Sequence, residues 1–223
     1  ELASEFAAAH DHGAEGVGLY RTEFLYLGRS EPPSEEEQFN AYREILQEMH
    51  PHPVTIRTLD SGGDKVVPEL NVTDEANPAM GLRAIRFSLR EPELFRTQLR
   101  AILRASVYGK VQIMFPMISG VAELRACKRM LRAAQDELDR DGIAYNPDFK
   151  LGIMVETPSA VLLAPFLAEE VDFISLHSYP LWEYKNIDEA LGYTEENYYA
   201  VRDRYPHKQV IITEAGWATN SNN

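Results

Sequence analysis

The chain has 223 residues, of which 44% are hydrophobic, so it can bury the core of one large domain or of two small ones. Its formal net charge of −13, from 22 basic and 35 acidic residues, excludes the positive field on which non-specific binding to nucleic acid or anionic membranes depends. The sequence shows no apolar run that could span a membrane and no secretory leader, and its single cysteine, Cys127, has no disulfide partner within the chain, so we expect a cytoplasmic protein.

Short apolar runs alternate with longer segments of helical periodicity. In chain order they predict helix 2–12, strand 16–21, helix 34–49, strand 54–59, helix 91–107, strand 111–117, helix 120–141, strand 151–156, helix 158–169, strand 171–179, helix 188–204 and strand 210–217. Ser34 is placed to cap the helix at 34–49 while Glu37, three residues later, reaches back. The alternation indicates parallel strands that are buried on both faces.

Two architectures fit this alternation, an open doubly wound sheet and a (β/α)8 barrel of the TIM type. The sequence contains neither G-x-G-x-x-G nor the P-loop pattern, which weakens the first. Reactive side-chain types fall at or just beyond the carboxyl ends of the predicted strands, where a barrel gathers its active site: Arg21, Glu23, Arg57, Asp60, Glu156, His177 and Glu214. We therefore predict an α/β fold of the (β/α)8 TIM-barrel type, incomplete because only about six strands can be counted.

Six motifs in the first 175 residues carry a specific resemblance. GAEGVGLYRTEFLY, RTLDSGGDK, NPAMGLRAIR, ELFRTQLRAILRAS, IMFPMIS and GIMVETPSA occur in this order. Residues 1–175 thereby resemble the phosphoenolpyruvate-binding (β/α)8 domain of enzyme I of the bacterial sugar phosphotransferase system. The resemblance implies a barrel that binds phosphoenolpyruvate and takes part in phosphoryl transfer.

The resemblance also implies roles for individual residues. It assigns substrate binding to Arg21, Arg57 and Arg83, with Lys65 as a nearby ammonium group, and magnesium binding to Glu156. The chemistry agrees, because guanidinium groups bind phosphate and carboxylate through paired hydrogen bonds. Mg²⁺ usually needs only one or two protein carboxylates beside the oxygens of its substrate.

From the residues alone, a purely structural interpretation stays open. Arginines at the rim of a barrel also form ion pairs with neighbouring carboxylates, here Glu23, Asp60 or Asp64. In that interpretation the arginines hold no ligand.

The resemblance fails directly after VDFIS, residues 171–175. It implies an Asn–Asp pair there, with the aspartate as second magnesium ligand, but Tyr179 and Pro180 occupy those positions. A further arginine of the family and the cysteine that would protonate the pyruvate enolate also have no counterpart. Because phosphoryl transfer depends on positioning and charge neutralisation, these losses predict weak or absent activity.

A second resemblance begins at residue 171. VDFISLHSYPLWEYKNIDEAL and YYAVRDRYPHKQVIITEAGWATNS resemble the C-terminal part of a family 17 glycoside hydrolase or transglucosylase, a (β/α)8 enzyme that acts on β-1,3-glucans. The resemblance implies that Glu214 is a catalytic nucleophile and Trp217 a sugar-stacking residue. No Asn–Glu pair supplies the acid/base that retaining glycosidases also need, which leaves Glu156 as the comparable carboxylate.

We therefore interpret the chain as one barrel-type domain, 1–223, made of an enzyme I-like segment, 1–175, and a glycosidase-like segment, 176–223. The expected function is that of a chimeric, engineered scaffold with a remnant site for phosphoenolpyruvate or phosphate, weak Mg²⁺ binding and little or no catalysis. Two alternatives stay open: a phosphoenolpyruvate-protein phosphotransferase of the enzyme I type, and a β-1,3-glucan hydrolase or transglucosylase. The first and eighth barrel strands are missing from this prediction, so the open edges invite self-association.

Overall fold

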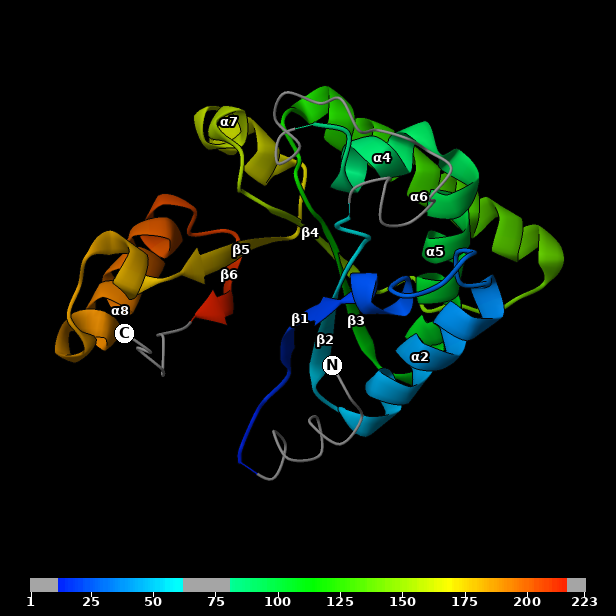
Figure 1. Cartoon of the computed structure of the whole chain (residues 1–223), viewed down its shortest axis with the longest axis horizontal. Coiled ribbons are helices and arrows are strands. Elements are labelled where there is room, and N and C mark those ends of the chain that lie inside the picture. Colours follow the sequence, from blue (N-terminus) through cyan, green and yellow to red (C-terminus); the bar gives the residue numbers. More distant parts are fainter. Residues whose placement is uncertain (1–11, 62–80, 216–223) are drawn as a thin grey trace.

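The computed structural model describes residues 12–61 and 81–215. Its centre is one parallel sheet in which each strand pairs with the next along the chain (Figure 1). The strands are β1 (Val17–Arg21), β2 (Pro53–Arg57), β3 (Lys110–Phe115), β4 (Lys150–Met154), β5 (Phe173–Ser178) and β6 (Gln209–Ala215). This sequential order is that of a barrel, because the order reverses within a doubly wound sheet.

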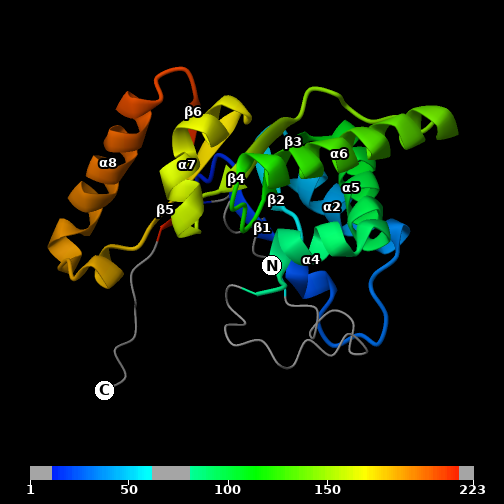
Figure 2. The same cartoon turned by 90° about the horizontal axis from the view of Figure 1, so that it is seen from above.

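Helices cover the outside of the curled sheet. They are α2 (Glu35–Glu48), α4 (Ala84–Arg90), α5 (Pro92–Ala105), α6 (Val121–Asp141), α7 (Pro158–Glu169) and α8 (Ile187–Arg204), with 3₁₀ turns η1 (Thr22–Leu25), η2 (Ser106–Tyr108) and η3 (Pro180–Glu183). In both views α2, α4, α5 and α6 gather on the side of β1 to β4, whereas α8 lies at the other end with β5 and β6 (Figures 1 and 2). The incomplete fold of the TIM-barrel type is confirmed.

The predicted elements are largely present. All six strands lie within one or two residues of their predicted bounds, except that the end predicted for the last strand falls outside the described residues. Glu37 N–H donates to Ser34 Oγ at 3.2 Å and Ser34 N–H to Glu37 Oε2 at 2.8 Å, so the predicted capping of α2 is confirmed. Helix 2–12 lies outside the described residues except for its last position.

One helix was missed. α4 spans 7 residues that the sequence analysis left without an element, because so short a segment cannot display the helical period. None of the helices within residues 12–61 and 81–215 has both the length and the apolar character that crossing a membrane requires.

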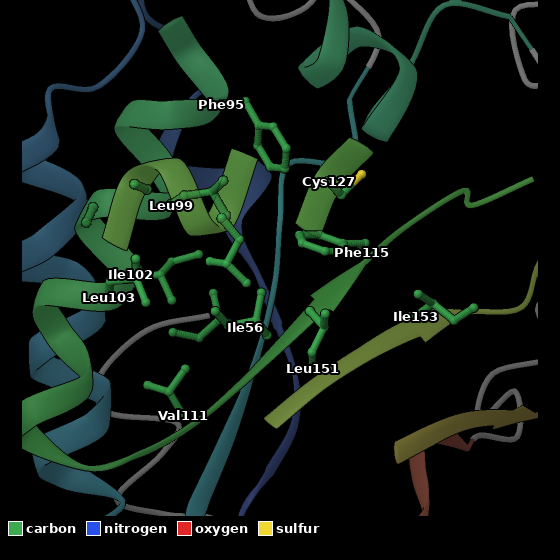
Figure 3. Close-up of a cluster of buried hydrophobic side chains, with 14 of the residues drawn as sticks. Ile56, Phe95, Leu99, Ile102, Leu103, Val111, Phe115, Cys127, Leu151 and Ile153 are labelled. Atoms are coloured by element: carbon green, nitrogen blue, oxygen red, sulfur yellow. The ribbon is translucent and has the colours of Figure 1, made fainter. Parts of the chain in front are cut away.

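The outer face of the sheet forms the main hydrophobic core. Side chains that alternate along the strands point toward the helices and pack against them (Figure 3). The strands contribute Ile56, Val111, Phe115, Leu151 and Ile153, and the helices contribute Phe95, Leu99, Ile102, Leu103 and Cys127. Cys127 is a buried residue of α6, within the helix predicted at 120–141, and burial raises the pKa of its thiol. Removal of this apolar surface from water holds the helices against the strands.

The inner face of the sheet is more polar. Thr55 Oγ1 donates to Gln112 Oε1 at 2.8 Å between β2 and β3, and the hydroxyls of Ser175 and Thr213 hydrogen-bond between β5 and β6. Beside them lies a small apolar cluster of Met114, Met154 and Phe173. Most strand residues are thus covered on both faces, as the near-continuous apolar runs predicted.

The two edges of the sheet meet. A Cβ atom on Gly18 of β1 would lie 3.0 Å from the Cα and O atoms of Thr213 in β6, so the two backbones are in van der Waals contact there. No ladder joins β1 to β6 in the described part of the chain. A pocket of about 210 Å³ opens between the starts of these strands, bordered by Gly16, Gln112 and Gln209. The sheet therefore curls toward closure without the hydrogen bonds of a closed barrel.

Gly109 gives a test of the packing between β3 and α2. A Cβ atom there would lie 2.6 Å from the carbonyl oxygen of Leu46, a contact that the backbone can relieve only by moving. We expect Gly109→Ala to lower the free energy of unfolding by about 1–3 kcal/mol, as overpacking does elsewhere. Urea denaturation measures the change.

Gly192 supplies the control. It lies within α8 with no heavy atom near its would-be Cβ, so Gly192→Ala should raise the free energy of unfolding by about 0.5–1 kcal/mol, the usual gain in a helix interior. A Gly109→Ala protein that unfolds at the wild-type urea concentration would contradict the close contact.

Candidate functional site

Five charged side chains meet near the carboxyl ends of β1, β2 and β4. Arg57 is the last residue of β2 and Asp60 follows three positions later, while Glu23 lies in η1 directly after β1. Arg83 is the N-cap residue of α4, and Glu156 lies two residues beyond β4. Because parallel strands end at the same edge of a sheet, residues far apart in the chain come together here.

Arg57 is paired with two carboxylates. Its Nη2 donates to Glu23 Oε1 at 2.6 Å, and its Nη1 lies 3.0 Å from Asp60 Oδ2. The other oxygen of Asp60, Oδ1, accepts from Arg83 Nη2 at 2.9 Å, so one carboxylate joins two arginines. The side chains of Arg57 and Asp60 are only 8% and 9% exposed, so these charges are poorly screened and depend on one another.

A buried glutamine fixes the strand ends that carry this cluster. Gln98 of α5 donates from Nε2 to Thr22 Oγ1 at 3.1 Å, and its Oε1 accepts from the N–H of Leu59 at 2.9 Å. Thr22 Oγ1 donates in turn to the carbonyl of Arg57 at 2.9 Å. Gln98 is not among the residues predicted for the site from the sequence. The available signal was a polar residue on the apolar face of the helix.

Two of the three non-glycine residues with positive φ in the described residues lie beside the cluster. Ala84 has φ +51° and Met117 has φ +56°, a region that residues with a side chain seldom adopt. The Ala84 N–H donates to the carbonyl of Ser61 at 3.0 Å, and the Met117 N–H donates to Glu156 Oε1 at 2.7 Å. Backbone strain of this kind clusters at functional sites. The positions of Ala84 and Met117 therefore indicate that the functional site lies at this edge of the sheet.

Glu156 is the carboxylic acid at this edge of the sheet whose pKa is shifted. Although Glu156 as a whole residue is exposed, partial withdrawal of its carboxyl group from water raises its pKa above the ordinary value, and the N–H of Met117 opposes the rise. The nearby charge of Asp60 raises this pKa further, whereas Arg57 and Arg83 lower it. A perturbed acid beside two arginines is typical of a functional site.

Each of the two arginines has a buried donor without a hydrogen-bond partner among the described residues. Among the described residues, Nε of Arg57 and Nε of Arg83 are buried and make no hydrogen bond, and neither does Oε2 of Glu23. A buried donor without an acceptor costs free energy, so the cluster gains stability from a ligand that accepts from these N–H groups. Phosphate and carboxylate are the groups that guanidinium binds best. The arrangement can therefore hold a small anion.

The structure brings together part of the predicted site. Arg57, Arg83 and Glu156 lie near one another, and the ion pairs of a purely structural interpretation are present as well. Arg21 is the register partner of Arg57 on the neighbouring strand, with an exposed side chain. Lys65 lies outside the described residues. Ligand binding by these residues stays a prediction.

For the residues predicted to act in a glycosidase site, only the backbone position of Glu214 is described. Glu214 lies in β6, where its backbone is the register partner of His177 in β5, and its side chain is outside the described part, as is Trp217. The nucleophilic role of Glu214 stays a prediction.

Magnesium binding at Glu156 stays a prediction. Tyr179 and Pro180 follow β5 where a second magnesium ligand was expected, and no group of three or more His, Cys, Asp or Glu within residues 12–61 and 81–215 is placed to hold a metal ion. Glu156 fits Mg²⁺ only together with oxygens of a bound anionic ligand, which suits an ion that usually takes few protein ligands.

A pocket of about 250 Å³ also borders Glu156. It lies between the ends of β4 and β5 and the helices α7 and α8, and its lining is mostly apolar, with Val155, Ile174, Leu176 and Tyr205. Neither Arg57 nor Arg83 lines it, so this pocket is distinct from the arginine cluster.

Comparison with known proteins adds a family context. Residues 1–185 match the family described as PEP-utilising enzyme, PEP-binding domain, where PEP is phosphoenolpyruvate. A phosphoenolpyruvate-protein phosphotransferase of Staphylococcus epidermidis is 53% identical over 174 residues, which covers 78% of this chain and 30% of the relative. One of Priestia megaterium is 46% identical over 208 residues, covering 89% of this chain and 36% of the relative. The chain thus spans about a third of the length of these relatives.

Among solved structures, a psychrophilic glycoside hydrolase family 10 endo-beta-1,4-xylanase has a TM-score of 0.44 and 9% identity, covering 96% of this chain and 70% of that one. A likeness this weak carries no argument about function.

These comparisons overturn the predicted composite function. The family match extends from residue 1 to 185, across the junction predicted at 175–176, and a relative that covers 89% of the chain must cross it too. The prediction of an engineered scaffold with little or no catalysis is therefore wrong, and the enzyme I alternative is the better supported one. The change at Tyr179 and Pro180 lies inside the family match, and the division into segments 1–175 and 176–223 stays a prediction.

Glu156 should make stability depend on pH in a defined direction. Its pKa is higher in the folded than in the unfolded chain, so the folded state loses stability as the pH rises from the ordinary glutamate value through the raised one. Glu156→Gln keeps an oxygen for the Met117 N–H but cannot ionise. We expect the variant to be as stable as wild type below about pH 4 and more stable than wild type near neutral pH. Thermal unfolding midpoints measured across this pH range check the difference.

Glu196→Gln is the control, because Glu196 is exposed in the middle of α8, away from the charged ends of the helix dipole, and its stability should run parallel to that of the wild type. A Glu156→Gln protein that is less stable than wild type at neutral pH would contradict the assigned environment of this carboxyl group.

Proposed function

The chain belongs to the PEP-utilising enzymes, through the PEP-binding domain that residues 1–185 match, and from this premise we propose that it binds phosphoenolpyruvate and supports transfer of its phosphoryl group. The relatives are described as phosphoenolpyruvate-protein phosphotransferases, and the chain corresponds to about a third of their length. We propose that it supplies the PEP-binding part of the same reaction, with a protein as phosphoryl acceptor.

One observation carries this proposal. Arg57 and Arg83 come from different elements, are joined through Asp60, and each keeps a buried Nε–H without an acceptor among the described residues. Phosphoenolpyruvate offers both a phosphate and a carboxylate, and each can accept paired hydrogen bonds from a guanidinium.

Phosphoryl transfer asks the protein mainly to position the phosphoryl group and to neutralise its charge. Arg57, fixed through the Gln98 network, would position one anionic group of the substrate, and Arg83 would bind the other. Arg21, on the strand beside Arg57, and Lys65 are proposed to add positive charge.

Glu156 would hold Mg²⁺ together with oxygens of bound phosphoenolpyruvate, where the ion supplies charge neutralisation. The raised pKa of Glu156 reflects partial withdrawal of its carboxyl group from water and, to a smaller extent, the like charge of Asp60, which a bound cation would offset.

Self-association is a further part of the proposal. The edges of β1 and β6 touch at Gly18 but share no ladder in the described residues, and strand edges that form no ladder can pair with other chains. The net charge of −13 still disfavours nucleic acid as a partner.

Arg83→Lys should weaken the binding of phosphoenolpyruvate roughly tenfold to a hundredfold, because lysine keeps the positive charge beside Asp60 but loses the planar pair of donors. The rise of the thermal unfolding midpoint with phosphoenolpyruvate, with and without Mg²⁺, reports binding. Lysine is chosen because removing a charge from this buried network would itself destabilise the fold.

Arg96→Lys is the matched control. Its side chain is 34% exposed, against 33% for Arg83, and it also pairs with carboxylates, Glu93 and Glu137. The control should bind phosphoenolpyruvate as wild type does. If Arg83→Lys also binds as tightly as wild type, the arginine cluster is not the substrate site.

A further inference from the structure

The four ion-paired side chains of the arginine cluster balance one another in charge before a ligand arrives. Arg57 and Arg83 bring two positive charges, and Glu23 and Asp60 bring two negative charges within ion-pair distance. A phosphorylated anion therefore approaches arginines whose charge is already compensated, so one of the two carboxylates must give way if the anion is to gain a strong ion pair.

The two carboxylates are bound in different ways. Asp60 uses both oxygens, one on Arg57 and one on Arg83, and its side chain is 9% exposed. Glu23 uses only Oε1, at 2.6 Å from Arg57 Nη2, and its side chain is 18% exposed. Its Oε2 is buried and has no hydrogen-bond partner in residues 12–61 and 81–215.

This difference decides which carboxylate can leave. Displacing Asp60 breaks contacts with two arginines at once and separates them. Displacing Glu23 breaks one contact and frees an oxygen whose burial without a partner is unfavourable. Glu23 is therefore the more easily displaced group, and Asp60 holds the two arginines together.

The backbone limits the displacement to the Glu23 side chain. The preceding Thr22 is buried and hydrogen-bonded to the carbonyl of Arg57 and to Gln98, and the carbonyl of Glu23 accepts from the Tyr26 N–H at 3.0 Å. The chain is thus anchored on both sides of residue 23, and rotation about side-chain bonds is enough to move the carboxylate off Arg57.

We propose that Glu23 is an internal competitor for the anion-binding face of Arg57: it occupies Nη2 in the free protein and leaves when an anionic group of the ligand takes its place. This inference rests on the proposed function. It adds that Glu23 and Asp60 balance the charge of the two arginines in the free protein, and that the affinity for the substrate is lower than the arginines alone would give.

The test is calorimetric titration of the 223-residue chain with phosphoenolpyruvate and, separately, with inorganic phosphate, both without Mg²⁺. We expect Glu23→Gln to bind both anions roughly fivefold to tenfold more tightly, because a neutral amide competes weakly for a guanidinium. Asp60→Asn should bind them at least about tenfold more weakly, because the arginines lose the group that joins them.

The matched control is Glu137→Gln. Glu137 also accepts from two arginines, Arg96 and Arg100, with a side chain that is 22% exposed, but it lies on α6 away from the cluster. This variant should bind both anions with wild-type affinity. Glu23→Asp is a second test of Glu23, because the shorter side chain keeps its charge but lies farther from Arg57. This variant should also bind both anions more tightly than wild type.

The two substitutions are expected to change anion affinity in opposite directions. Tighter binding by Glu23→Gln indicates that Glu23 competes with the ligand, and weaker binding by Asp60→Asn indicates that Asp60 positions the arginines. Equal or weaker binding by Glu23→Gln overturns the inference, and if that variant fails to fold, Glu23→Asp decides by the same criterion. A wild-type chain that binds phosphoenolpyruvate, together with Glu23 variants that bind it less well, would overturn this inference alone. A wild-type chain that binds phosphate but not phosphoenolpyruvate would overturn the proposed function, while the phosphate titrations still decide the role of Glu23. Binding of neither anion would overturn both.

Discussion

The buried charge of Arg57 is the constraint on which the site depends. A guanidinium that is only 8% exposed must keep carboxylates within ion-pair distance, because a buried charge without a counter-charge costs about 3–5 kcal/mol. Asp60 lies in the turn directly after β2, and its second oxygen forms an ion pair with Arg83 at the start of α4. Glu23 is supplied by the turn after β1, because β1 and β2 are neighbours in register. One charge thus organises three chain segments.

The sheet and its core make that arrangement possible. Six parallel strands in chain order bring their carboxyl ends to one edge, and the apolar outer face holds them against the helices. Gln98 of α5 then holds the segments after β1 and β2 in place through hydrogen bonds to Thr22 and Leu59. Local strain at Ala84 and Met117 persists because both residues are held by hydrogen bonds and buried in this framework.

The chemistry of the site follows from charges that nearly balance. Two arginines and two carboxylates compensate one another, and a further carboxyl group, Glu156, is kept partly from water beside them. Such a site favours a ligand that brings its own negative charge and can exchange with a carboxylate already present.

The sequence by itself determined the strands, the capping of α2, the incomplete barrel and the motifs around Arg57, Arg83 and Glu156, because periodicity, capping and short motifs are properties of neighbouring residues. It missed α4, which is too short to show a period, and its composite interpretation treated the change at Tyr179 and Pro180 as a change of family, although the family match continues through it. Only the tertiary structure decided that Glu23 and Asp60 share Arg57, that Gln98 fixes the strand ends, and that the edges of β1 and β6 touch at Gly18. These are contacts between residues distant in the chain, and their partners are chosen by how the sheet curls and which charges it buries.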